Sequence, residues 1–394
     1  MMRKKLFGLL VLLGAFALVF ALSGCSSPTG SDDNGTPPPS GDEVELFSPI
    51  SSSRTLGIPY GQKNYVYNGS TMLHVNNNAV LTILPGTTIR FSNAGGGIEF
   101  DDSASLVGVG LPKLLDIHGN VIKVGNVELD GHIKFIGGAS KGSWVGVYFE
   151  NSAPQTMEYV DILNAGNDSA KGAVWLRGAG AGDGILSMDY CTIDGAKYYG
   201  LCAQGDATIS SFSNNKISNC NIPVIVDRPA TLVQFDGTSD LTVNTQKYVL
   251  VNNGIIYSNM TLNAATVPYQ LHDHLNINVG YTLTVKSGVT FWMESAAYIF
   301  VGGTINATGV TFTRPTGSTF YWGYITFNGY GNTLTNCTIE YGGSSSPLLN
   351  FYLYSGATFT NTTVRNLNPT AAITNITPPP AITSGVAYTG AITN

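Results

Sequence analysis

The sequence has little charge, few cysteines and few histidines, and each shortage excludes a class of protein. Charged residues make up 11% of the 394 positions, and 19 Lys and Arg against 25 Asp and Glu give a net charge of −6. A chain with so little positive charge offers no electrostatic surface for nucleic acid. The cysteines and histidines form neither a CxxC pair nor a cluster with zinc spacing. A hydrophobic fraction of 43% without helical periodicity excludes disorder and coiled coil.

The first residues carry a targeting pattern. A positive segment, Arg3-Lys4-Lys5, precedes an uncharged apolar run of 17 residues, Leu6 to Leu22. This pattern predicts a secretory signal peptide over residues 1–24. The following residues, 25–45, are rich in Ser, Pro, Gly and Asp without apolar periodicity, and we expect them to form a flexible tether.

The signal ends in Leu22-Ser23-Gly24-Cys25, which resembles the lipobox of bacterial lipoproteins. The resemblance implies cleavage before Cys25 and acylation of that cysteine, so that the chain is anchored to a membrane. It also implies a location at the outer membrane or the cell surface. An ordinary signal peptide with an incidental cysteine is the alternative.

Internal repeats dominate the rest of the chain. Leu81–Phe91 matches Leu283–Met293 at an offset of 202, and Trp144–Phe149 matches Trp322–Phe327 at an offset of 178. Shorter repeats recur at spacings of 24 and 25, in Tyr190–Ile193, Asn214–Ile217, Asn336–Ile339 and Asn361–Val364. Short alternating segments followed by turns, without helices between them, predict a β-solenoid, since one coil cannot bury its own apolar face. We expect an all-β, single-stranded parallel β-helix with about 24 residues per coil.

The phrases at 81–91, 144–149 and 336–339 resemble the right-handed parallel β-helix proteins of the pectate-lyase-like superfamily. The resemblance covers residues 62–368 and implies a right-handed fold, while the superfamily includes lyases, hydrolases, adhesins and other surface proteins. We divide the exported chain into an N-terminal cap, two stacked β-helix modules and an irregular C-terminal tail, at 46–61, 62–235, 236–368 and 369–394.

Four further cysteines lie in the repeats, an even number that in an exported protein favours disulfides. A coil of about 24 residues, however, stacks Cys191 on Asn215 and Cys220 on Ala196, so no two cysteines share a site in adjacent coils. We therefore expect free, buried thiols, with a Cys202–Cys220 bridge as the alternative.

Candidate catalytic residues follow from the resemblance. It implies acidic calcium ligands with an Arg or Lys base in the lyases, and two or three close aspartates in the hydrolases. The densest charged stretch supplies Asp161, Asp168, Lys171 and Arg177. Their spacing lacks the pairing of these enzymes, and Asp168 lies in a segment typical of turns. We expect a protein that is not an enzyme; a polysaccharide lyase or glycoside hydrolase is the alternative.

The sequence predicts no cofactor and no metal site. His272 and His274 would point to the same side of a strand, but no third ligand stands near them. Calcium is not expected to be required, because the carboxylates are spread among turns.

Outward aromatic residues are the favoured ligand-binding candidates. Strand alternation puts Val147 and Phe149 inside and leaves Tyr148 outside, and an offset of 27 places Trp175 above Tyr148. The same reasoning turns Phe291, Ile325 and Phe327 inward. The outward candidates for stacking on sugar rings are Trp144, Tyr148, Trp175, Trp322, Tyr324 and Tyr352. The expected function is binding or adhesion to a polysaccharide or surface glycan; purely structural stacking and protein contact are the alternatives.

Overall fold

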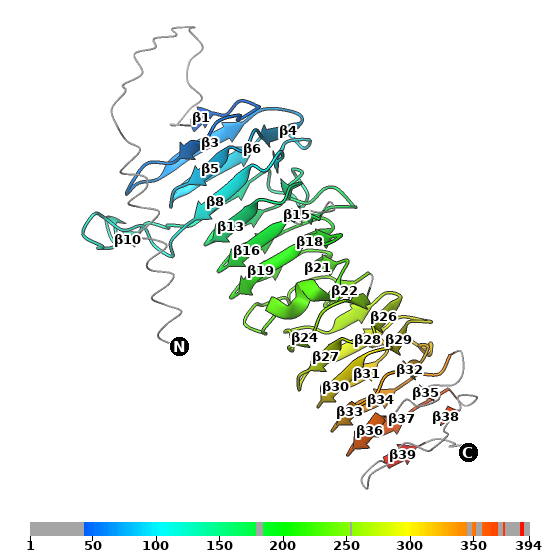
Figure 1. The fold of residues 1–394 in the computed structure, drawn as a ribbon. Helices are drawn as coiled ribbons and strands as arrows, with labels where there is room; N and C mark the ends of the chain where they lie inside the picture. The colour runs from blue at the N-terminus through cyan, green and yellow to red at the C-terminus, as the bar shows by residue number, and fades with distance from the viewer. Residues whose placement is uncertain are drawn as a thin grey trace, which may run out of the picture. The chain divides into compact units, whose positions relative to one another are not determined.

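The chain folds as an all-β parallel solenoid of about 12 turns, with about 25 residues per turn (Figure 1). The computed structural model describes residues 43–178, 184–252, 254–344, 349–351, 357–368, 373–374 and 387–389. The predicted signal peptide, Cys25 and most of the C-terminal tail therefore lie outside the described residues. None of the helical segments in the described ranges reaches the length and hydrophobicity of a membrane span.

The longest sheet of the described residues has thirteen parallel strands and runs through both sequence modules. We call it the shared sheet. Its strands are β4 (Met72–Val75), β7 (Gly97–Phe100), β12 (Val147–Phe149), β15 (Val174–Arg177), β18 (Tyr199–Gln204), β21 (Ile222–Val226), β22 (Val249–Val251), β25 (Tyr269–Leu271), β28 (Thr290–Met293), β31 (Thr311–Thr313), β34 (Thr338–Glu340), β37 (Thr363–Arg365) and β39 (Ala387–Thr389).

Two further sheets complete the coils of the first module. One consists of β1 (Glu43–Glu45), β3 (Lys63–Tyr67), β6 (Thr87–Phe91), β11 (Ile133–Ile136), β14 (Val160–Leu163), β17 (Thr192–Asp194) and β20 (Lys216–Ser218). The other consists of β2 (Arg54–Leu56), β5 (Val80–Ile83), β8 (Ser105–Val109), β13 (Pro154–Glu158), β16 (Ile185–Asp189) and β19 (Thr208–Ser213). Each full coil of this module therefore contributes one strand to each of three sheets.

The second module completes its coils with two other sheets. One consists of β23 (Gly254–Ile256), β26 (His274–Ile277), β29 (Tyr298–Val301), β32 (Ile325–Phe327), β35 (Leu349–Phe351) and β38 (Ile373–Thr374). The other consists of β24 (Met260–Leu262), β27 (Thr282–Val285), β30 (Thr304–Thr308), β33 (Asn332–Thr335) and β36 (Ala357–Thr360). Only the shared sheet is continuous across the junction, within the described part of the chain.

The modules meet one strand out of phase. Leu81–Phe91 forms β5 and β6, outside the shared sheet, whereas the matching Leu283–Met293 leads into β28 of the shared sheet. Likewise Trp144–Phe149 leads into β12 of the shared sheet, whereas Trp322–Phe327 leads into β32 outside it. Matching segments of the two modules therefore lie in different sheets, shifted by one strand along the coil. This shift explains why two of the three sheets are interrupted at the junction.

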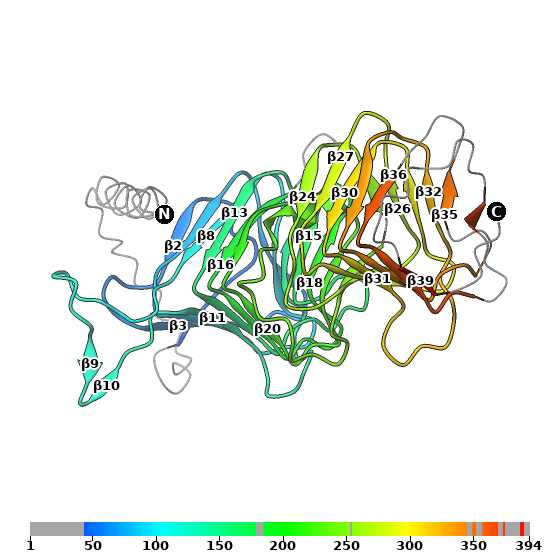
Figure 2. The same cartoon turned by 90° about the horizontal axis from the view of Figure 1, so that it is seen from below.

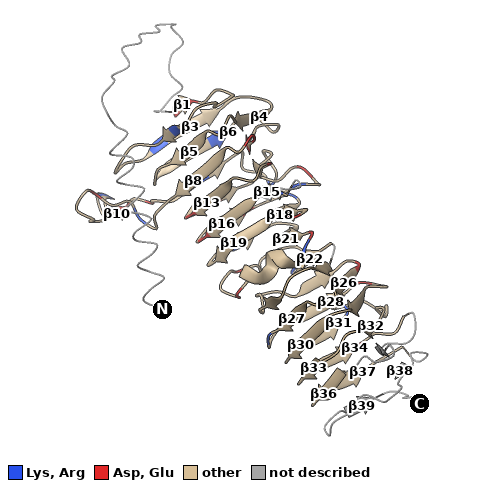
Figure 3. Cartoon of the chain, viewed as in Figure 1, with Lys and Arg blue, Asp and Glu red and all other residues tan. Residues whose placement is uncertain are grey.

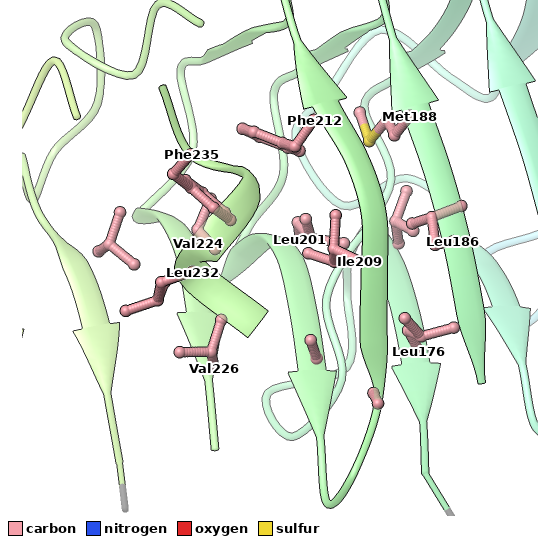
Figure 4. Packing of buried hydrophobic residues seen from close by; sticks show 14 of the residues in the cluster. Leu176, Leu186, Met188, Leu201, Ile209, Phe212, Val224, Val226, Leu232 and Phe235 are labelled. Carbon is pink, nitrogen blue, oxygen red and sulfur yellow. The ribbon is translucent and has the colours of Figure 1, made fainter. Parts of the chain in front are cut away.

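A short 3-10 helix, η1 (Pro229–Gln234), fills the core at this junction. It packs against β19 on one side and against β23 and β24 on the other. Phe235, directly after it, stacks on Phe212 with ring centroids 4.3 Å apart (Figure 4). The helix therefore keeps the interior apolar where strands do not continue.

Alternating apolar side chains form one buried core from Leu46 to Val364. The predicted inward residues Phe149, Phe291, Ile325 and Phe327 are all buried, which confirms their assignment. Each inward side chain packs on coils before and after it, so the coils stabilise one another.

The four described cysteines are free and buried, as predicted, and no Cys202–Cys220 bridge forms. The predicted register of Cys191 is confirmed, because its N–H donates to the side-chain oxygen of Asn215, 2.9 Å away in the next coil. Burial raises the pKa of the Cys191, Cys202, Cys220 and Cys337 thiols, so they act as small apolar core residues.

One insertion leaves the coils. Residues 111–131 contain the antiparallel hairpin β9 (Lys123–Val124) and β10 (Val127–Glu128), which projects from the solenoid (Figure 2). Because of this insertion, Phe100 and Phe149, which are 49 positions apart, pair directly in β7 and β12.

Candidate functional site

The outward face of the shared sheet carries one row of register-matched side chains whose character changes along the solenoid. The row begins with charged residues, continues with mostly aromatic and aliphatic ones, and alternates apolar and polar residues in the second module. We call it the outward row. Its members are His74, Glu99, Tyr148, Trp175, Cys202, Ile225, Leu250, Gln270, Trp292 and Thr313.

The predicted aromatic strip, Tyr148 and Trp175, lies in this row but is covered. The predicted pairing of the two residues is confirmed by the strand register. Their exposed fractions are only 2% and 4%, and their rings meet edge to face, 5.3 Å between centroids. The segment before β15 folds over them, with the Lys171 ammonium 3.9 Å from the centre of the Trp175 ring. The backbone carbonyl of Ala170, in the same segment, accepts a hydrogen bond from the Gln204 side chain. These rings form a second, small core outside the sheet.

Two other aromatic candidates were assigned to the wrong side. Trp144 and Trp322 are fully buried in the main core, not outward. Their indole N–H groups donate to the backbone oxygens of Leu163 and Glu340, at 2.8 and 2.7 Å. Both residues lie before the strand, where alternation does not apply: Trp144 is in a bend, Trp322 forms an isolated bridge with Gly342, and Gly146 after Trp144 has a φ of 145°. The repeated tryptophan therefore stabilises the fold of each module, through its burial and its hydrogen bond to the backbone.

The remaining aromatic candidates differ in what the structure describes. Tyr324 is partly exposed and stacks on Tyr298, with centroids 5.1 Å apart. Tyr298 in turn stacks on His274 at 5.4 Å, so three rings from successive coils form a ladder. Tyr352 lies outside the described residues.

The catalytic candidates lie in two separate places. Asp161 is in β14 and hydrogen-bonds His132 at 3.0 Å, which raises the pKa of that imidazole. Asp168 accepts from the N–H of Ala170 in a turn. Asp168, Lys171 and Arg177 lie in the second place, near the shared sheet, since Asp168 and Lys171 are in the segment before β15 and Arg177 is the last residue of β15.

Lys171 and Arg177 approach Glu150, at 3.6 and 3.8 Å. Figure 3 shows that charged residues lie mostly at turns and strand ends, apart from the blue positions on β3 and β6, while the strands of the later coils are largely uncharged. Glu150 was not among the predicted site residues. It belongs to a charged group that the coil brings together with His74, Glu99 and Asp101.

This charged group occupies the first coils of the shared sheet. Nδ1 of His74 lies 2.8 Å from an Asp101 carboxylate oxygen and 3.7 Å from a Glu99 oxygen. Burial, together with the charges of Asp101 and Glu150, raises the pKa of Glu99. Sequence spacing contained the signal, since His74 and Glu99 are 25 residues apart, one coil length.

A second set of rings lies at the turn between β13 and β14 and at its equivalent in the next coil. Tyr159 and Tyr190 stack with centroids 4.8 Å apart and an interplanar angle of 13°, and His132 meets Tyr159 edge-on at 5.5 Å. We call these three residues the turn stack. Tyr190 is 43% exposed and is the last ring of the stack. The sequence contained a signal for this residue, since Tyr190 stands where the repeats at 214, 336 and 361 have asparagine, but the sequence analysis selected aromatic residues by strand alternation and did not consider turn positions.

Backbone strain marks both tyrosines of the turn stack. Tyr159 and Tyr190 have φ values of 51° and 56°, in the left-handed region. The equivalent residues in other coils are Asn214, Asn336 and Asn361, with φ values of 55°, 53° and 48°. Asparagine tolerates this conformation well, whereas bulky residues adopt it rarely and at a cost. Strained non-glycine residues of this kind concentrate at binding sites.

Carboxylates border the turn stack. Glu158 and Asp189, the residues just before the two tyrosines, are direct partners in neighbouring strands. Burial and the charge of Asp189 raise the pKa of Glu158. Asp189 accepts hydrogen bonds from Ser211 and from the hydroxyl and N–H of Ser213, which hold its carboxylate in place.

The two histidines considered as metal ligands bind carboxylates instead. His272 Nδ1 lies 2.8 Å from Glu294, and His274 Nδ1 lies 2.7 Å from Asp273. Among the described residues they do not converge with a third ligand.

Comparisons of the chain with protein-family models, with curated proteins and with solved structures give no match. Any functional proposal therefore depends on the side chains described above.

Proposed function

We propose that this protein is an exported bacterial lipoprotein whose solenoid binds glycans at the outer membrane or the cell surface. The apolar run and the lipobox-like Leu22–Cys25 support export and a lipid anchor at Cys25. A solenoid supports a binding or adhesive role, because stacked coils create an extended surface with one repeated geometry.

The observation that carries the glycan proposal is the turn stack. Two tyrosines occupy left-handed turn positions that matched coils give to asparagine, and the outer ring is 43% exposed. Packing does not require this choice, since asparagine serves the same turn elsewhere in the chain. An exposed, rigidly held aromatic ring offers an apolar face of the kind on which sugar rings stack.

The charges around the turn stack indicate the class of glycan. Glu158, Asp189 and Asp161 lie close to Tyr159, Tyr190 and His132, and the net charge of the whole chain is −6. Carboxylates accept hydrogen bonds from sugar hydroxyls and repel sugar carboxylates. The expected ligand is a neutral or amino-sugar glycan rather than a polyuronate.

The enzymatic alternative is less well supported. Asp161 contacts His132 in one sheet, whereas Asp168 caps a turn near the shared sheet, so these two carboxylates do not form a pair. A lyase or hydrolase would need carboxylates that converge on one bond of the substrate. We therefore propose binding rather than glycan cleavage.

The test is a Tyr190→Asn variant, which removes the ring and keeps a residue suited to the turn. After a glycan-array screen selects ligands, we expect Tyr190→Asn to weaken binding by about 1–3 kcal/mol, by analogy with bases stacked on aromatic rings. The melting temperature should stay constant or rise, because asparagine relieves the strain.

Tyr257→Asn is the matched control. Tyr257 is 54% exposed, and no ring partner is found for it in the described part of the chain. Its replacement should leave glycan affinity unchanged. Wild-type affinity in Tyr190→Asn, or a clear fall in its melting temperature, would show that the turn stack is structural.

A further inference from the structure

The first coils of the shared sheet hold three potential metal ligands in one small volume. They are Nδ1 of His74 on β4, a carboxylate oxygen of Glu99 on β7 and one of Asp101 just after β7. These three atoms all lie within 4.8 Å of one another. All three side chains are partly exposed, so an ion can reach them from solvent.

The charge balance at this place is negative. Glu99, Asp101 and Glu150 lie together, and the neighbouring cations Lys171 and Arg177 contact Glu150. The imidazole of His74 is the group in contact with the other two carboxylates. A divalent cation would offset the charge that remains on Glu99 and Asp101.

A second observation points to a ligand on the same side. Tyr148 is the strand partner of Glu99, and it is only 2% exposed. Its hydroxyl is buried and has no hydrogen-bond partner among the described residues. The carboxylates whose charges act on this hydroxyl are those of Asp168 and Glu99. Buried hydroxyl groups are normally satisfied, so an unpaired one on the strand next to Glu99 points to a bound water or group on this side of the sheet.

We propose that His74, Glu99 and Asp101 bind a divalent transition-metal ion, with zinc as the representative. One imidazole nitrogen and two carboxylate oxygens form a ligand set that suits zinc. Three protein ligands leave a position for water, and a metal-bound water gives the Tyr148 hydroxyl its partner. Tyr148 thus acts as a positioning residue outside the ligand set. This proposal is independent of glycan binding at the turn stack.

The experiment titrates zinc into the purified full chain at pH 7 against a chromogenic chelator. We expect one zinc ion per chain. His74→Gln and Glu99→Gln should each weaken binding at least tenfold, whereas Tyr148→Phe should weaken it less and leave the stoichiometry unchanged. Circular dichroism checks that each variant folds. If His74→Gln does not fold, Glu99→Gln alone tests the site.

His118→Gln is the matched control, because His118 is an exposed histidine on the projecting insertion, away from the cluster. Its replacement should leave zinc affinity unchanged. The proposal is overturned if zinc does not bind, if His74→Gln and Glu99→Gln bind zinc with wild-type affinity, or if only calcium binds. Loss of zinc binding without loss of glycan binding would leave the proposed function intact, and the reverse result would leave the metal site intact.

Discussion

Replacing Trp175 by alanine separates the structural role of the outward row from a binding role. The indole ring is 4% exposed, meets the Tyr148 ring edge to face, and lies 3.9 Å below the Lys171 ammonium. Its N–H donates to the side-chain oxygen of Gln204 at 2.8 Å. Because almost all of its surface is buried in these contacts, the ring has no exposed face on which a sugar can stack.

The magnitude follows from these contacts. Truncating a buried tryptophan to alanine costs about 3–5 kcal/mol. The cation–π contact with Lys171 contributes about 1 kcal/mol, and the hydrogen bond to Gln204 about 1 kcal/mol. These contributions overlap, because they are made by one side chain. We expect Trp175→Ala to lower the free energy of unfolding by about 3–5 kcal/mol and to leave glycan affinity unchanged.

The assay is urea unfolding followed by circular dichroism, together with hydrogen exchange of the amides in β12, β15 and β18, because coils of a solenoid open locally. Trp175→Phe is the conservative control and should lose about 1–2 kcal/mol, since it keeps an aromatic ring without the N–H donor. If Trp175→Ala lowered the free energy of unfolding by less than about 1 kcal/mol and weakened glycan binding, the assignment of Trp175 as a buried structural residue would be wrong.

Three further results are expected. Cys25→Ala should abolish acylation and release soluble protein, and palmitate labelling that persists in this variant would contradict the lipid anchor. Phe327→Ala should destabilise the protein by about 3–5 kcal/mol in urea unfolding, because Phe327 is fully buried; a loss under 1 kcal/mol would mean that the inward assignment is wrong. The hydrogen bond from Asp161 raises the pKa of His132, so this pair stabilises the fold fully below about pH 6.5 and loses its effect as pH rises through the raised pKa. The melting temperature of His132→Gln should therefore fall below that of wild type at pH 5–6 and approach it at high pH; an equal difference at all pH values would exclude this mechanism.

The fold was predictable because solenoid coils repeat their constraints. Alternation identified Phe149 and Phe327 as inward, and a spacing of 24 placed Cys191 on Asn215. The shift of matching segments by one strand between the two modules was not predictable in this way. Matching sequences such as Leu81–Phe91 and Leu283–Met293 predict similar strands and bends. They do not predict which sheet each strand joins.

The site was less predictable, for two physical reasons. Alternation gives the direction of a side chain but not what folds over it, so Tyr148 and Trp175 were correctly placed in one row and are nevertheless covered. The insertion at 111–131 separates Asp101 from Glu150 by 49 positions, although the two strands involved are neighbours. A search at one fixed coil length does not find such a pair.

Availability to a ligand depends on where in the coil an aromatic residue lies. Tyr148, on a sheet face, is followed in its coil by a segment that returns across the strand and buries it. Tyr190 lies at a turn, where the chain bends away, and its ring stays exposed although its backbone adopts an unfavourable conformation. The cost of that conformation needs a compensating benefit. The stack on Tyr159 contributes to it, but an asparagine, which tolerates this conformation better, would lower the cost itself. Our proposal assigns the remainder to ligand binding, and it locates the proposed glycan surface at the turns of the solenoid rather than on the outward face of the shared sheet.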